Sequence, residues 1–200
     1  MKTSQPFSQQ LEQWLKSPTP KTLTNLTEAF AEKSFAICFL LLMFIPALPL
    51  PTGGITHVFE IITMLLALEL TIGRHTVWLP RRWRHKPLGA ATQKKAIPFM
   101  IRRIRWFERF ARRRLSGLLE DPWVVRFVGL IVFVLALAAF LAPPFSGIDT
   151  LPSLGIVAIA LSLVLEDAVI FIIGLFIGAA GVGVEVGLST LIVHFLHINL

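Results

Sequence analysis

Carboxyl groups that lie within or at the ends of long apolar stretches are the side chains of this chain best suited to chemistry. They are Glu60, Glu69, Glu166, Asp167 and Glu185. Because an ionisable group in apolar surroundings is costly, each is a candidate for binding a proton or another ion. Glu60 and Glu185 lie deepest in their segments. Ion pairing with Arg74 is the alternative for Glu69, and a surface turn is the alternative for Glu166 and Asp167.

The sequence gives little support for a metal site, a disulfide, a phosphate-binding loop or a catalytic triad. His194 and His197 could share a helical face as metal ligands, but no third ligand has a matching spacing, so a pair at a membrane interface is favoured. Cys38 is the only cysteine, which excludes disulfides and cysteine-based zinc sites. The chain lacks a P-loop ending, a defensible Ser-His-Asp arrangement and a nucleophile elbow. We therefore expect no enzyme, no cofactor and no bound metal.

The composition points to a membrane as the setting for these carboxyl groups. The 200 residues are 54% hydrophobic and 16% charged, with a mean hydropathy of +0.71. Soluble domains carry about a quarter charged residues, so we expect an all-α integral membrane protein.

The apolar segments that must position the carboxyl groups are interrupted. Residues 35–45 would rise about 17 Å as a helix, whereas the hydrocarbon core of a bilayer is about 30 Å thick. This segment is expected to be one arm of a re-entrant hairpin or to continue a helix that begins within residues 27–33. The other apolar segments are residues 55–72, 123–142, 151–165, 168–184 and 186–200.

Two of the interruptions resemble each other. An offset of 97 residues pairs Pro46 with Pro143 and Glu69 with Glu166, and each unit has a Pro/Gly break between two apolar arms. We interpret this as an internal repeat, with chance similarity of apolar segments as the alternative. The breaks are expected to meet and line a polar site for an ion or a proton. The residues assigned to it are Glu60, Glu69, Glu166, Pro46, Pro143, Gly53 and Gly54. The alternative is that each break is an ordinary turn at the membrane surface.

Most of the positive charge lies between the apolar segments. Residues 74–114 hold 14 of the 19 lysines and arginines and one acidic residue, Glu108. By the positive-inside rule this stretch is cytoplasmic, and the membrane explains the charge better than nucleic acid does. Its second half has helical periodicity and predicts an amphipathic helix, either lying on anionic headgroups or packed on the protein. The arginines on its polar side are Arg102, Arg103, Arg105, Arg109, Arg112 and Arg113.

Residues 1–33 form a polar N-terminal segment with short amphipathic helices. Thr22 or Thr24 is expected to cap the second of them, which would run to about residue 33. No cleaved signal peptide is indicated. Further along, Gly174 and Gly178 form a small-xxx-small pair suited to close helix packing.

The order of motifs resembles a known family. The pieces are IPALPLPTGG, GRHTVWLPRRW, IRRIRWFERFARRRL and APPFSGIDTLPSLGIVAIALSLVLEDAVI. Together they resemble the ExoD family of bacterial exopolysaccharide-synthesis proteins over roughly residues 30–185. The resemblance implies a multi-pass inner-membrane protein linked to exopolysaccharide production and supplies no catalytic residues.

The expected protein has about four to six membrane segments. Its membrane domain covers residues 34–200: a broken hairpin at 35–72, a basic cytoplasmic stretch at 73–121, a second broken hairpin at 123–167, and glycine-rich segments at 168–200. The leading function is support of exopolysaccharide synthesis or export through the polar site. The alternative is a non-transporting scaffold whose basic helix recruits partners or anionic lipids. Expected partners are the bilayer, the polysaccharide-synthesis machinery and a second copy of the chain.

Overall fold

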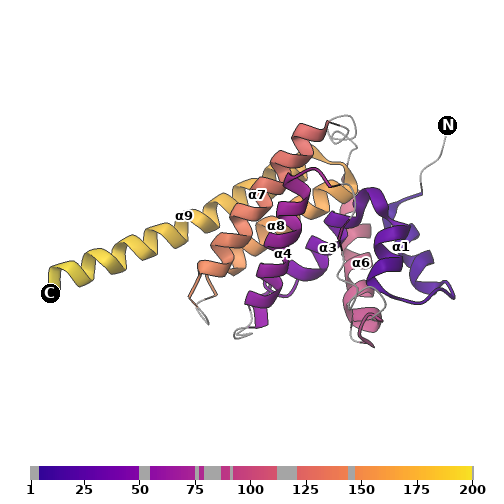
Figure 1. Cartoon of the computed structure of the whole chain (residues 1–200), viewed down its shortest axis with the longest axis horizontal. Coiled ribbons are helices and arrows are strands. Elements are labelled where there is room, and N and C mark those ends of the chain that lie inside the picture. Colours follow the sequence, from indigo (N-terminus) through magenta and orange to yellow (C-terminus); the bar gives the residue numbers. More distant parts are fainter. Residues whose placement is uncertain are drawn as a thin grey trace.

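A computed structural model of the chain is helical along most of its described length (Figure 1). It describes residues 5–49, 55–74, 77–78, 87–90, 92–111, 121–143 and 147–199. Within these ranges the only extended pairing is one bridge between Thr22 and Pro87. The prediction of an all-α fold is therefore confirmed.

Two helical hairpins form the centre of the molecule. The first joins α3 (Ser34–Met43) to α4 (Ile55–Thr71), and the second joins α7 (Pro122–Leu141) to α8 (Thr150–Leu165). α3 packs against α8, and α4 packs against α7. α9 (Ala168–Asn199) follows and packs mainly against α8.

Contacts at both ends show that the two hairpins point the same way. The ring of His57, at the start of α4, lies 5.3 Å from that of Phe140, at the end of α7. At the opposite end, the Lys33 ammonium donates to the Val164 carbonyl, 2.6 Å away, so α3 begins where α8 finishes. We call the end where α4 and α8 begin the tip end, and the end where α4 and α8 finish the base end.

The helix boundaries follow from local sequence. α7 begins after Asp121, whose carboxylate accepts the Trp123 amide at 2.9 Å. α8 ends at Glu166, whose φ of 58° lies in the left-handed region. Thr22 caps α2 (Leu23–Ala29) by accepting the Asn25 amide at 3.2 Å, as one of the two predicted caps. α2 ends before the predicted residue 33, and a short turn, η1 (Ala31–Lys33), leads into α3.

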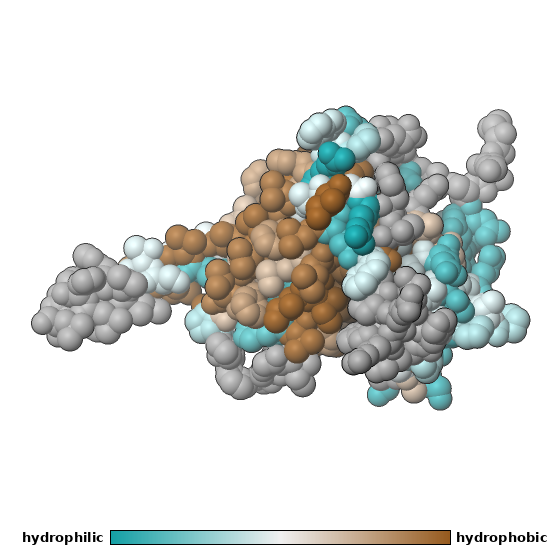
Figure 2. Space-filling view, viewed as in Figure 1, coloured by the Kyte–Doolittle hydropathy of each residue, from teal (hydrophilic) through white to brown (hydrophobic). Residues whose placement is uncertain are grey.

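Two of the described helices, α7 and the Ala168–Leu191 part of α9, are long and apolar enough to cross a membrane. α3 has 10 residues and rises only about 15 Å. The outward faces of the hairpins are apolar, and Figure 2 shows a hydrophobic area across the middle of the molecule. The exposed apolar side chains of α4 and α7 include Val58, Ile61, Leu65, Leu68, Phe127, Leu130, Val134, Leu137 and Leu141.

Glycines bring α8 and α9 into close contact. A Cβ atom built on Gly155 would lie 2.6 Å from the Cα atom of Gly178 and 3.0 Å from the carbonyl oxygen of Gly174. The small pair on α9 therefore does provide close helix packing, here against α8. Glu185 does not divide this region, because residues 168–199 form one continuous helix rather than the two expected segments.

The amphipathic helix predicted from the arginine-rich stretch is present as α6 (Ile97–Glu108), after a π-helical turn, η2 (Thr92–Ala96). Its apolar face is buried and packs beside α1 (Phe7–Lys16). Those buried side chains are Ile97, Met100, Ile101 and Ile104. This arrangement matches the alternative of a helix packed on the protein.

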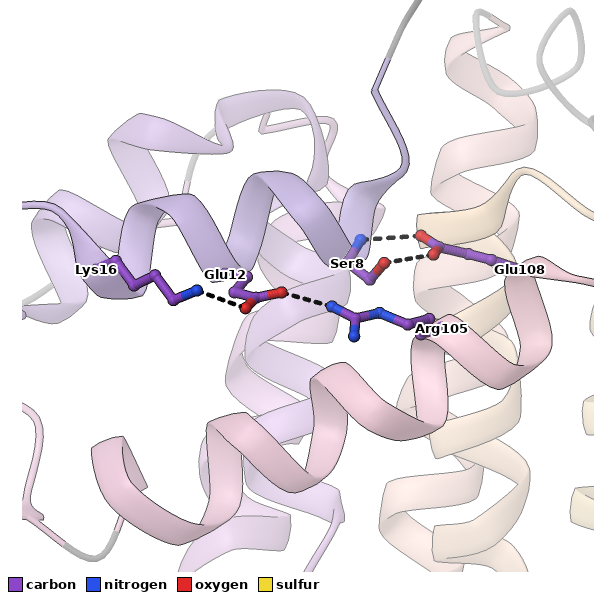
Figure 3. Close-up of polar contacts among 5 residues, drawn as sticks. All are labelled: Ser8, Glu12, Lys16, Arg105 and Glu108. Atoms are coloured by element: carbon purple, nitrogen blue, oxygen red, sulfur yellow. Dashed lines mark hydrogen bonds and ion pairs between the residues drawn. The ribbon is translucent and has the colours of Figure 1, made fainter.

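Polar contacts join α1 to α6 (Figure 3). Glu12 pairs with Arg105 and, at 2.7 Å, with Lys16. The Glu108 carboxylate accepts the Ser8 amide at 2.9 Å, which satisfies a free backbone donor in the first turn of α1. The N-terminal segment is thus docked on the basic helix.

Candidate functional site

A buried glutamate on α4 is the centre of the candidate site. Glu60 is 0% exposed, and its Oε2 lies 2.7 Å from Nδ1 of His57, one turn earlier on the same helix. Its other oxygen, Oε1, is buried and has no hydrogen-bond partner in the part of the chain that the structure describes. A buried carboxyl group with one unsatisfied oxygen costs free energy unless it is protonated or binds a ligand.

Two further carboxyl groups lie close to this pair. Asp149 stands between α7 and α8, next to the first turn of α8. Burial raises the pKa of the Asp149 carboxyl, while backbone hydrogen bonds and the charge of His57 act in the opposite direction. Glu185, on α9, is near enough to interact electrostatically with both Asp149 and Glu60, and its Oε1 is buried without a partner.

Helix packing explains why Glu185 reaches the tip end. A Cβ atom on Gly181 would lie 2.6 Å from Cδ of Pro152, so α9 runs directly beside the first turn of α8. Glu185 is one helical turn beyond Gly181 and therefore lies near Asp149. Glu60 is fully buried and the other three groups are half-buried around it; we call His57, Glu60, Asp149 and Glu185 the buried polar cluster.

Buried hydroxyl groups occur on the same two helices. Thr63 lies three residues after Glu60, and Ser153 lies in the first turn of α8. Both side chains are 0% exposed, and their oxygens lack hydrogen-bond partners. Such groups can accept or donate hydrogen bonds to a bound ion or water.

The arrangement suits proton chemistry better than metal binding. Among the described residues, no three histidine, cysteine, aspartate or glutamate side chains converge closely enough to hold a metal ion. The Glu60–His57 distance, by contrast, is within the range for direct proton transfer.

The structure places the predicted Glu69 and Glu166 at the base end, away from Glu60. Glu69 accepts the Trp78 amide at 2.9 Å and lies 3.9 Å from Arg74, which matches the ion pair considered as its alternative. Glu166 pairs with Lys33 at 2.9 Å. The three carboxyl groups predicted to act together are thus divided between two ends. A shared site for all three is not present in the described structure.

The break residues are only partly described. Pro46 is fully buried and Pro143 is exposed, while Gly53 and Gly54 lie outside the described residues. The side chains of His194 and His197 also lie outside them.

Sequence reasoning missed part of the buried polar cluster. His57 stands three residues before Glu60, a spacing that places both on one helical face and could have revealed the pair. Asp149 lies in the interruption between the apolar segments 123–142 and 151–165. Asp149 comes close to Glu60 only because two separate hairpins pack together, and a single sequence does not show how hairpins pack.

The predicted arginine surface is partly present. Arg102, Arg103, Arg105 and Arg109 are exposed on or just after α6, beside the exposed Trp106. Arg103 lies over the ring of Phe99, 5.0 Å from its centre. Arg112 and Arg113 lie outside the described residues.

Comparison with known proteins identifies one family and two relatives of this chain. Residues 7–187 match the protein family described as "Exopolysaccharide synthesis, ExoD". A Synechocystis sp. protein named slr1875 is 26% identical over 82% of this chain and 78% of its own length. Protein ExoD of Rhizobium meliloti is 27% identical over 78% of this chain, and the match spans 65% of that relative's length. No solved structure matches significantly.

Proposed function

Because the chain belongs to the ExoD family of exopolysaccharide-synthesis proteins, we propose that it is a multi-pass inner-membrane protein whose buried polar cluster binds an ion or a proton while it supports synthesis or export of the polymer. In this proposal it acts without catalysing a reaction and works together with the polysaccharide-synthesis machinery.

The apolar exterior supports the membrane setting. α7 is 20 residues long, about 30 Å, and its exposed side chains are mostly apolar. α9 carries a further exposed apolar face, which includes Ile172, Ile173 and Phe176. Soluble monomers rarely expose so large an apolar area. The shorter α3, α4 and α8 would supply the broken or re-entrant segments, for a total of four to six.

The orientation follows from charge. The base end carries Lys33, Arg74 and Arg126, and the C-terminal end of α6 lies near it, where Glu108 lines a cavity together with Lys33. We propose that the base end and residues 74–114 face the cytoplasm, by the positive-inside rule. The buried polar cluster then lies toward the other side of the bilayer.

The observation that carries the proposal is the complete burial of Glu60 with an unpartnered oxygen between apolar helices. A purely structural glutamate would be expected to have both oxygens satisfied. The retention of such a costly group is explained if it must take up and release a ligand.

Complementation of a strain lacking this protein tests the proposal. Extracellular polysaccharide is measured with wild type, Glu60→Gln and the double variant Glu69→Gln/Glu166→Gln, all matched for membrane abundance. We expect Glu60→Gln to lose polymer production and the double variant, altered only at the base end, to keep it. Full activity of Glu60→Gln would overturn the proposed site.

A second function is favoured by the exposed side of α6. With its apolar face buried against the protein, Arg102, Arg103 and Trp106 remain free to meet anionic headgroups or an acidic partner. In this scaffold function, Arg102→Glu/Arg103→Glu would abolish polymer production and Glu60→Gln would not. Normal production by the charge-reversed variant would exclude it.

A further inference from the structure

We propose that the ligand of the buried polar cluster is a proton, carried by Glu60 and exchanged with the outside through His57. This inference rests on the proposed function, since it identifies what the same site binds.

The four titratable groups cannot all be charged together. Three carboxylates and one imidazolium would leave a net charge of −2 in a largely apolar setting, and no lysine or arginine lies in α4, α8 or α9 to balance it. Burying uncompensated charge is so costly that carboxyl groups take up protons instead. Among the four groups only Glu60 is fully buried, so Glu60 is the carboxyl group that must hold a proton.

Within the described residues, no other element offers a counter-charge. The part of α7 that approaches His57 carries Phe140 and no titratable residue, since Arg126 lies at the base end. The one titratable side chain of α3 is the buried thiol of Cys38, which lies near Glu69 rather than near the cluster. The titratable groups that face Glu60 and His57 from the remaining helices are the two other carboxyl groups of the cluster. They are Asp149, which precedes α8, and Glu185 of α9.

His57 provides the route for exchange. Glu60 is fully buried, whereas the His57 side chain is 24% exposed, so the imidazole links the buried carboxyl group to the surface. The proton on Oε2 of Glu60 passes along the hydrogen bond to Nδ1 of His57, 2.7 Å from the oxygen, giving a carboxylate and an imidazolium. The imidazolium then releases a proton to water, and the reverse sequence restores the acid. No oxidant or co-reactant is needed.

Infrared spectroscopy of the purified full-length protein in lipid nanodiscs tests the inference directly. A protonated carboxyl group has its own carbonyl absorption, which shifts when the proton is replaced by deuterium. We expect this band in wild type near neutral pH, its loss in Glu60→Gln, and no change in Glu69→Gln, the matched control at the base end.

The role of His57 has a separate readout. In His57→Gln the band should remain, but its exchange with deuterium should slow by about 100-fold, the usual contribution of a positioned acid–base group. The exchange measurement in His57→Gln tests the proposal even if Glu60→Gln fails to accumulate. Exchange at the wild-type rate in His57→Gln would overturn the proposed proton transfer through His57.

Two results would overturn proton binding and leave the proposed function standing. One is a wild-type spectrum without the band while Glu60→Gln still fails to support polymer production. The other is loss of the band on adding Na⁺ or K⁺ at constant pH, which would identify a metal cation as the ligand. The opposite combination is also informative. If the spectra are as expected but Glu60→Gln produces normal polymer, the proton site stands and its proposed role in polymer production is refuted.

Discussion

Replacement of Gly155 by alanine should separate α8 from α9. The new Cβ atom would lie 2.6 Å from the Cα atom of Gly178 and 2.7 Å from its amide nitrogen. Carbon atoms pack at about 3.5–4.0 Å, so the backbone of α9 must withdraw by about 1 Å. Neither of these neighbouring atoms belongs to a flexible side chain that could move instead.

The expected loss of stability follows from two opposing effects. Overpacking costs about 1–3 kcal/mol, and a backbone obstacle favours the upper part of that range. Alanine gains about 1 kcal/mol over glycine in helix propensity. The free energy of unfolding should therefore fall by about 2 kcal/mol in Gly155→Ala.

Gly183→Ala is the matched control on α9. A Cβ atom there meets no atom within 4 Å, so only the propensity gain remains, and stability should rise by up to about 1 kcal/mol. Both variants are compared by denaturant unfolding in the same detergent, with polymer production measured in parallel. If Gly155→Ala is as stable as Gly183→Ala, α8 and α9 do not meet at Gly155, and the placement of Glu185 beside Asp149 is wrong.

Three further predictions concern the base end and the N-terminal helix. Arg105→Glu should loosen α1 and speed its amide hydrogen exchange, and Glu12→Arg in the same protein should restore protection; failure of the swap would show that the pair does not hold α1. Lys16 and Arg105 hold the pKa of Glu12 below its ordinary value of 4.5, so the stabilisation is complete above that value and is lost as pH falls through the lowered pKa. The protection of the α1 amides, taken relative to their intrinsic exchange rate at each pH, should therefore fall in acid in wild type and show no such dependence in Glu12→Gln. Lys33→Met should lower the free energy of unfolding by about 2 kcal/mol, because Glu166 and the Val164 carbonyl lose a charged donor, and an unchanged midpoint of denaturant unfolding would refute that contact.

Apolar runs and their breaks located most helices of this chain within a few residues. The predicted segments 55–72 and 151–165 correspond to α4 (Ile55–Thr71) and α8 (Thr150–Leu165). Proline, glycine and capping residues act locally, so the sequence displays their effect directly. The spacing of Gly174 and Gly178 likewise predicted close packing, although not that α8 would be the partner.

The candidate site was harder to predict, because it depends on how helices pair. Glu69 and Glu166 correspond in the predicted repeat, and both lie at the base end, where each has a cationic partner. Because the two hairpins point the same way, residues at equivalent positions lie at the same end of the molecule. They still belong to different helices and need not contact each other. The association of Glu60 with Asp149 and Glu185 comes from contacts among separate helices, which single-sequence periodicity cannot supply.

Both hairpins begin their second arm at the tip end, and under the proposed function this common direction limits how access to the cluster could alternate between the two sides of a bilayer. In transporters with inverted repeats, the two halves exchange conformations and so open one site first to one side and then to the other. Exchange between α3–α4 and α7–α8 would leave the cluster at the same level. The glycines of α9 also oppose sliding along α8, because Pro152 lies against Gly181 and Leu135 against Gly178, where added Cβ atoms would each come within 2.6 Å. These contacts fix the level at which α9 holds Glu185.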